Sequence, residues 1–147
     1  MATMTGGCQC GRVRYSAEIG EEPVYLCHCG MCRRATGGVS AAFINLPKTS
    51  VTWGAREPDL YRSSPIAERG FCMACGTPLS FWYPDSATMD LTIGSFDDPA
   101  AFTPAYHSSV ETRLEAWVDT SALPGYRLDE HAGTVERWMK TVGHYPG

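Results

Sequence analysis

The chain has 147 residues and a formal net charge of −4, with 44% hydrophobic and 19% charged residues. This length predicts a single domain over residues 1–147 that buries an apolar core without help from disulfides. The acidic balance excludes a general attraction to nucleic acid or anionic lipid, and no apolar run approaches the roughly 18 residues that span a bilayer.

Fifteen glycines and ten prolines favour short strands and turns over long helices. Alternating or short apolar runs predict strands at 13–17, 24–26, 39–46, 51–53, 79–83 and 89–93, and a turn is predicted at 84–86. Near the end, Val135, Trp138, Met139 and Val142 recur at helical spacing and predict a short C-terminal helix. The pattern is typical of a mainly β, mainly antiparallel domain.

All seven cysteines fall in three short clusters: Cys8-x-Cys10, Cys27-x-Cys29-x-x-Cys32 and Cys72-x-x-Cys75. Disulfides within such spacings are strained, whereas two thiolates at these spacings can bind one ion. The first residues have neither the basic nor the apolar segment of a secretory signal, so we expect a cytoplasmic protein with reduced thiols. A thioredoxin-like redox role for Cys72 and Cys75 is disfavoured, because no βαβ pattern surrounds them in the sequence. Zinc is the leading interpretation, and an iron–sulfur cluster is the alternative.

The number of cysteines suggests how they are divided between metals. A structural zinc site is closed by four protein ligands, whereas a catalytic site keeps three and leaves one position open. The compact triplet Cys27, Cys29 and Cys32 is the candidate for the open site. The remaining two pairs would then form the closed site. Spacing alone leaves open a five-plus-two division, or one metal with spare thiols.

Three ordered motifs carry a family resemblance: GGCQCGRVRY at residues 6–15, CHCGMCRR at 27–34 and RGFCMACGTPL at 69–79. A weaker fourth motif, GSFDDP at 94–99, is followed by His107 and Trp117. These motifs resemble those of the glutathione-dependent formaldehyde-activating enzyme family, which includes centromere protein V. The resemblance runs in order from about residue 5 to about residue 125.

The resemblance implies a fold of two coiled antiparallel β-sheets of β-tent type, pinned by zinc. It implies two Zn²⁺ sites, a structural one on Cys8, Cys10, Cys72 and Cys75 and a reactive one on Cys27, Cys29 and Cys32. The family reaction joins formaldehyde and glutathione to give S-hydroxymethylglutathione. The expected partner is therefore a small-molecule thiol or thiol adduct.

Four polar side chains near the central cluster have two interpretations each. Arg33 and Arg34 bind a substrate carboxylate, or they offset the negative charge of the thiolates. His107 matches a family histidine and acts at the catalytic site with the three cysteines, or it is a core or surface histidine. His28 lies between two ligands, so its side chain points away from the metal in an extended segment, or it shuttles a proton.

Two functions are compatible with these motifs. The leading hypothesis is a zinc-dependent carbon–sulfur lyase that acts on a small thiol adduct of the S-hydroxymethylglutathione type. The alternative is a non-catalytic, zinc-stabilised β module that binds a protein partner. The number of protein ligands at the central cluster discriminates between them, because a free fourth position supports chemistry and a fourth protein ligand makes the site structural.

Overall fold

The computed structural model describes residues 1–146. The chain divides into two compact units, residues 1–114 and the segment from residue 115 onward. All seven cysteines lie in the first unit. The expectation of one domain over 1–147 stays a prediction where the second unit is concerned.

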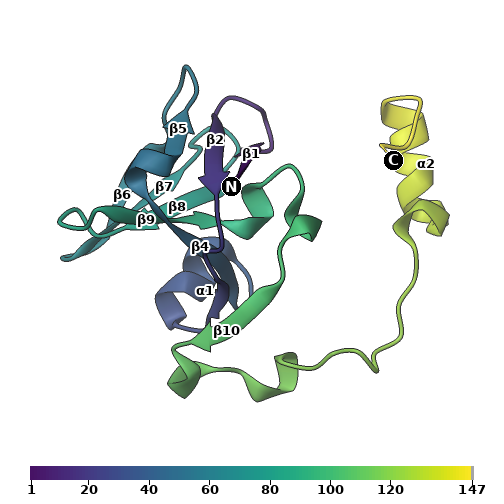
Figure 1. Ribbon diagram of the computed structural model, residues 1–147. Coiled ribbons are helices and arrows are strands. Elements are labelled where there is room, and N and C mark those ends of the chain that lie inside the picture. The colour runs from purple at the N-terminus through teal and green to yellow at the C-terminus, as the bar shows by residue number, and fades with distance from the viewer. Residues whose placement is uncertain (147) are drawn as a thin grey trace. The chain divides into compact units, whose positions relative to one another are not determined.

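The first unit is built from two β-sheets and one short helix (Figure 1). The smaller sheet has the order β1-β2-β5, with β1 at Ala2–Gly7, β2 at Arg14–Ile19 and β5 at Val51–Trp53. The larger sheet has the order β10-β3-β4-β9-β8-β7-β6. Its strands are β3 (Val24–Cys27), β4 (Ala41–Pro47), β6 (Asp59–Ser64), β7 (Ala67–Phe71), β8 (Pro78–Trp82), β9 (Thr88–Thr92) and β10 (Pro104–Ser108). Helix α1 (Gly30–Thr36) lies between β3 and β4 in the chain. The mainly β prediction with two sheets is confirmed.

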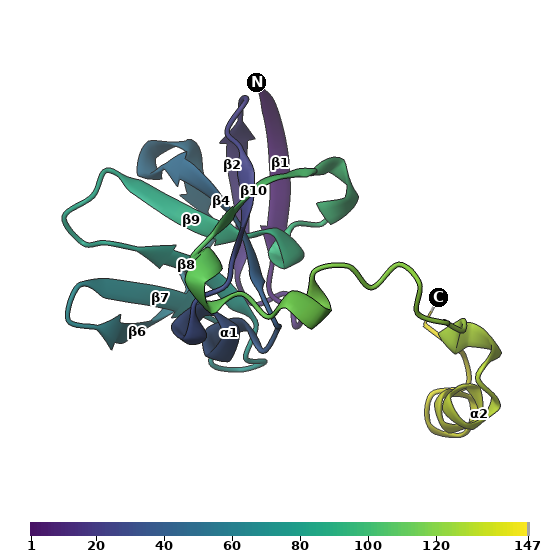
Figure 2. The same ribbon diagram turned by 90° about the horizontal axis from the view of Figure 1, so that it is seen from below.

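Each of the six predicted strands corresponds to an observed strand, and a hydrogen bond of 3.0 Å from Ser86 N to Tyr83 O closes the predicted turn. The sheets are mainly antiparallel, as predicted, and the exception lies at one edge, where β10 pairs with β3 in parallel. A long connection with two short 3₁₀ helices, at Ile93–Ser95 and Pro99–Ala101, separates β10 from β9 and allows this direction. Figure 2 shows the succession of β9, β8, β7 and β6 as a twisted fan.

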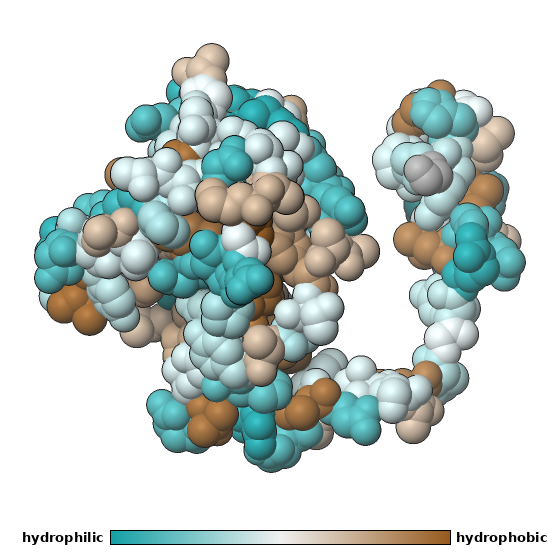
Figure 3. Space-filling model, in the orientation of Figure 1, coloured by the Kyte–Doolittle hydropathy of each residue, from teal (hydrophilic) through white to brown (hydrophobic). Residues whose placement is uncertain are grey.

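Both faces of the larger sheet are covered, and β4 shows this residue by residue. Ile44 and Leu46 belong to a core shared with Val13 and Tyr15 of the smaller-sheet side. Phe43 points to the opposite face, where it packs with Cys27 and Cys32 in a separate cluster. This double burial explains the nearly continuous apolar run of β4. On the face of the first unit seen in Figure 3, hydrophilic and pale residues predominate and hydrophobic ones occur in small groups.

The second unit contains the predicted C-terminal helix, α2, at Ala132–Thr141. Its side chains Trp138 and Met139 are exposed, as is Val142, which caps its C-terminal end. Among the described residues, neither α2 nor α1 has the length and apolar character needed to cross a membrane.

Asp97 joins the smaller sheet to the segment after β9, and its contribution to stability can be tested. Its Oδ1 accepts a hydrogen bond of 2.8 Å from Arg14, and its Oδ2 accepts one of 2.6 Å from Thr5. These contacts, that with Arg14 foremost, lower the pKa of Asp97 to about 2. The stabilisation is therefore complete above the unfolded pKa of about 3.9 and is lost as the pH falls towards 2.

We expect Asp97→Asn to lower the free energy of unfolding at pH 7 by at most about 1 kcal/mol, because the pair is half exposed to solvent. Urea unfolding of both proteins at several pH values measures this difference in free energy. The difference should shrink towards zero as the pH falls below about 4, because the carboxyl group of Asp97 then becomes protonated. Protonation of the cysteine thiolates at low pH would affect the stability of both proteins equally, so it cancels in the difference between their free energies of unfolding. Asp85→Asn in the β8–β9 turn is the control, and an equal loss there would contradict the assignment.

Candidate metal centres and adjoining pocket

Four thiols from two turns far apart in the sequence meet in one cluster. The Sγ atoms of Cys8, Cys10, Cys72 and Cys75 lie within 4.8 Å of one another. Cys8 and Cys72 are buried and belong to the core shared by the two sheets, whereas Cys10 is exposed. The cluster therefore sits at the edge of the core, with one side towards solvent.

The two turns that supply these thiols have the same backbone design. Cys8 N donates to Val13 O and Cys72 N donates to Thr77 O, each over 3.0 Å and five residues. In both turns the glycine after the second cysteine has a positive φ, 78° at Gly11 and 81° at Gly76. Gln9 N donates to Thr77 Oγ1 over 3.1 Å and fastens one turn to the other. The first and third motifs, which were expected to pair, are thus linked by a hydrogen bond as well as by the proximity of their thiols.

The sulfur positions fit a tetrahedral metal. Sγ–Sγ separations of 3.5 Å (Cys8 to Cys10) and 3.8 Å (Cys10 to Cys72) are far longer than a disulfide bond. Four sulfurs each about 2.3 Å from a central zinc would lie about 3.8 Å apart. In addition, Val13 N donates to Cys8 Sγ over 3.2 Å, as expected for a sulfur that carries negative charge. Four thiolates with these spacings could bind zinc.

A second cluster consists of three thiols, those of Cys27, Cys29 and Cys32, within 4.8 Å of one another. Cys27 ends β3, Cys29 caps α1 by accepting a hydrogen bond of 3.2 Å from Cys32 N, and Cys32 is the buried residue of that helix. Helix α1 was not predicted, because its seven residues include a glycine at the start and no apolar repeat. The first turn of α1 places Cys32 beside Cys29, so the two thiols of the C-x-x-C segment could bind the same metal ion.

The protein supplies a cation to this three-thiol cluster. Arg69 on β7 is buried, stacks on Phe81 with its guanidinium carbon 4.7 Å from the ring centroid, and donates to Cys32 Sγ over 3.3 Å. A hydrogen bond with Cys32 lowers the pKa of Cys27 to about 5, and the same contact raises the pKa of Cys32. The Cys27 thiolate is thus favoured even before a metal binds, and Arg69, through its contact with Cys32, adds a positive charge to the same cluster.

The two histidines of interest lie together. His28 is buried and its Nε2 is 2.8 Å from Nδ1 of His107, which is exposed on β10. This contact follows from the parallel pairing, which sets Ser108 opposite Cys27 and His107 opposite Leu26. The three-thiol group itself contains neither histidine. The structure therefore brings His107 to the central motif as a neighbour of His28, beside the three candidate cysteine ligands.

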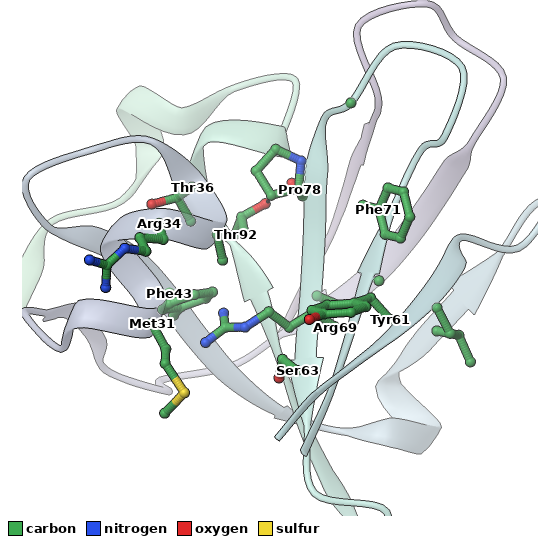
Figure 4. A pocket seen from close by; sticks show the side chains of 15 residues that line it. Met31, Arg34, Thr36, Phe43, Tyr61, Ser63, Arg69, Phe71, Pro78 and Thr92 are labelled. Carbon is green, nitrogen blue, oxygen red and sulfur yellow. Dashed lines mark hydrogen bonds between the residues drawn. The ribbon is translucent and has the colours of Figure 1, made fainter. Parts of the chain in front are cut away.

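The two predicted substrate arginines have different surroundings. Arg33 Nη1 donates to His28 O over 2.6 Å and to Thr112 O over 3.0 Å, so it fastens α1 to the segment after β10. Arg34, by contrast, lines a cavity of about 520 Å³ between α1 and strands β6, β7 and β8 (Figure 4). Substrate binding by either arginine stays a prediction, and the geometry favours Arg34.

Three side chains near the central cluster were not among the predicted site residues. Arg69 stands in the third motif, three residues before Cys72, and that position was its only signal. Tyr25, which is half-buried, pairs with the buried Asp90, and its Oη donates to Asp90 Oδ1 over 2.7 Å. Burial raises the pKa of Asp90. The partners lie 65 residues apart, so no local pattern could have joined them.

Comparison with known proteins agrees with this geometry. The sequence model of the glutathione-dependent formaldehyde-activating enzyme family matches residues 3–112. The chain belongs to this family. The matched segment falls within the first unit and contains all seven cysteines.

Two individual proteins illustrate the relationship. An uncharacterized lyase of Schizosaccharomyces pombe is 37% identical over 83 residues, which span 56% of this chain and 60% of the yeast protein. A crystal structure of a Rhodobacter sphaeroides protein superposes with a TM-score of 0.58 and 22% identity, covering 71% of this chain and 100% of that one. At that identity, the superposition supports the fold alone.

The positive φ of Gly76 predicts a specific cost for any side chain there. An added Cβ would meet no atom within 4 Å, so Gly76→Ala tests backbone strain without a clash. We expect a loss of about 1 kcal/mol in the free energy of unfolding, because an L-residue is disfavoured in the left-handed region. Gly94→Ala is the matched control, since its Cβ also meets nothing and its φ is not in that region. Equal losses in urea unfolding would contradict the assignment.

Proposed function

We propose that this member of the family is a zinc-dependent carbon–sulfur lyase that acts on a small thiol adduct. The carrying observation is the three-thiol cluster of Cys27, Cys29 and Cys32, a set that leaves one tetrahedral position for a substrate. The four-thiol cluster would hold the structural zinc. We also propose that the reaction takes place in the cytoplasm, where thiols stay reduced.

The reaction balances as a reversible addition of a thiol to an aldehyde. In the cleavage direction the carbon–sulfur bond breaks, the sulfur keeps the electron pair, and the adduct's hydroxyl loses its proton as the carbonyl forms. When bound, zinc supplies a Lewis acid that favours the thiolate form of the substrate sulfur. The chain's own contribution is Arg69, whose guanidinium lies against Cys32 Sγ and limits the negative charge of the site.

The proton of the hydroxyl needs an acceptor, and His107 is our candidate. Its ring is exposed on β10 and hydrogen-bonded to the buried ring of His28, which stands between two of the cysteines. The pair therefore links the central motif to solvent through two imidazoles. The same geometry counts against the alternative, a binding module in which a fourth protein ligand closes the site.

Metal content tests the division of the cysteines. We expect two zinc ions per chain, and a chelator that removes them should lower the melting temperature, because the structural site joins turns more than sixty residues apart. Cys29→Ser should retain one zinc and a folded core. Cys75→Ser, at a similarly half-buried position, should loosen the fold. Loss of both ions in Cys29→Ser, or an unchanged melting temperature after verified metal removal, would contradict the division.

Turnover tests the lyase itself. The rate of S-hydroxymethylglutathione formation, and of its cleavage, should exceed the spontaneous rate with the intact protein and fall to it in Cys29→Ser. Arg69→Gln should reduce turnover about tenfold, the effect of losing one charge-assisted hydrogen bond. His107→Gln should also be slower, whereas His131→Gln in the second unit should match the unmodified protein. Equal rates in Cys29→Ser and the intact protein would reject the proposal.

A further inference from the structure

The cavity beside the three-thiol cluster has mostly apolar walls. Figure 4 shows Met31 and Phe43 on one side and Tyr61 and Phe71 among the strands opposite. Its volume of about 520 Å³ is within the range of small-molecule sites, about 300–1,000 Å³. Two residues that line the cavity also contact the three-thiol cluster. Phe43 packs against Cys27 and Cys32, and Arg69 donates to Cys32 Sγ. None of the three thiols lines the cavity itself, so a molecule in it would lie one side chain away from the cluster, across Phe43 and Arg69.

The charged groups of the cavity have one sign. Among the described residues that line it, the charged ones are Arg34 and Arg69, and no acidic side chain is present. Arg69 already faces a thiol, and Arg34 makes no ion pair in the described part of the chain. Arginine binds carboxylates through two parallel hydrogen bonds. The cavity thus has a cation suited to an organic anion and nothing to pair with an ammonium group.

A buried hydroxyl adds a second polar anchor. Ser80 on β8 is 3% exposed and lines the cavity, and its Oγ has no hydrogen-bond partner within the described residues. A Cβ at Gly70 would lie 2.2 Å from this oxygen, so the glycine leaves the space that the hydroxyl occupies. An unpaired buried hydroxyl costs stability unless something binds it. Because Ser80 and Gly70 both line the cavity, this hydroxyl is a candidate hydrogen-bond partner for a bound molecule.

From the apolar walls, the two arginines and the unpaired hydroxyl, we infer that this cavity binds a small carboxylic acid with an apolar body, and that the lyase prefers a mercapto acid of this class over glutathione. The carboxylate lies at Arg34, the apolar body contacts Phe43 and Phe71, and Ser80 hydrogen-bonds the ligand. Glutathione fits less well, because no acidic side chain among the described residues of the lining can pair with its ammonium group. This inference rests on the proposed function for the identity of the reacting thiol, although carboxylate binding is measurable without any reaction.

Binding can be tested on the metal-loaded protein with hydrocinnamate, which has no thiol, and with hydrocinnamyl alcohol as its neutral analogue. By calorimetric or NMR titration, hydrocinnamate should bind about tenfold more tightly than the alcohol. Arg34→Gln should abolish this preference, and Arg137→Gln in the second unit should retain it. Ser80→Ala should weaken binding several-fold while leaving the protein at least as stable, because the hydroxyl it removes is unpaired.

Equal affinity for acid and alcohol, no binding of either, or a preference that survives in Arg34→Gln would overturn the inference. Dimerisation that Leu60→Asp at the cavity rim abolishes would also overturn it, because a second copy would then cover the cavity. The two proposals fail separately. Hydrocinnamate binding without turnover of any thiol adduct would reject the lyase and leave the acid site. Turnover that is faster with glutathione than with α-mercaptohydrocinnamic acid would reject the substrate preference and leave the lyase.

Discussion

The convergence of Cys8, Cys10, Cys72 and Cys75 is the constraint on which the rest of the first unit depends. Two of these thiols are buried in the core that both sheets share, so the cluster lies where the smaller sheet meets the larger one. Four thiolates placed this close repel one another unless a cation lies among them. A metal at this point would therefore stabilise the junction of the sheets as well as the two turns. The hydrogen bond between Gln9 and Thr77 shows that the backbone already favours that arrangement.

The larger sheet separates the two clusters by using both of its faces. Along β4, Ile44 and Leu46 point into the core that includes Cys8 and Cys72, whereas Phe43 points to the cluster of Cys27 and Cys32. On β8, Leu79 and Ser80 divide in the same way, one to the core and the other to the cavity. Strand alternation thus separates a structural face from a face available for chemistry. A one-residue slip of β4 would exchange the two sets of side chains.

Much of this arrangement could be predicted from local patterns. The apolar runs located six strands, and the spacing of the cysteines together with the family resemblance indicated both clusters. Strands β6 and β7 were missed because Arg62, Glu68 and Arg69 interrupt any apolar pattern. Strand β10 was missed because most of its residues are exposed and its partner, β3, is about eighty residues earlier. These elements bring Arg69 and His107 to the central cluster, so the polar surroundings of the thiols required the tertiary structure.

The surroundings of the thiols also bear on which substrates the site can accept. A three-thiolate zinc is itself anionic, and the binding of a further thiolate adds negative charge in a partly buried place. Arg69 offsets that charge from one side, and the cavity beside it contains Arg34 and no acidic group among the described residues that line it. The carboxylate substrate proposed above would therefore meet two arginines and no acidic side chain among the described residues that line this cavity. Arg69, which offsets the charge of the thiolate cluster, and Arg34, which would bind an acidic substrate, thus both contribute to the net charge around the site. Substitution of Arg69 should then alter reactivity and recognition together, whereas substitution of Arg34 should alter recognition alone.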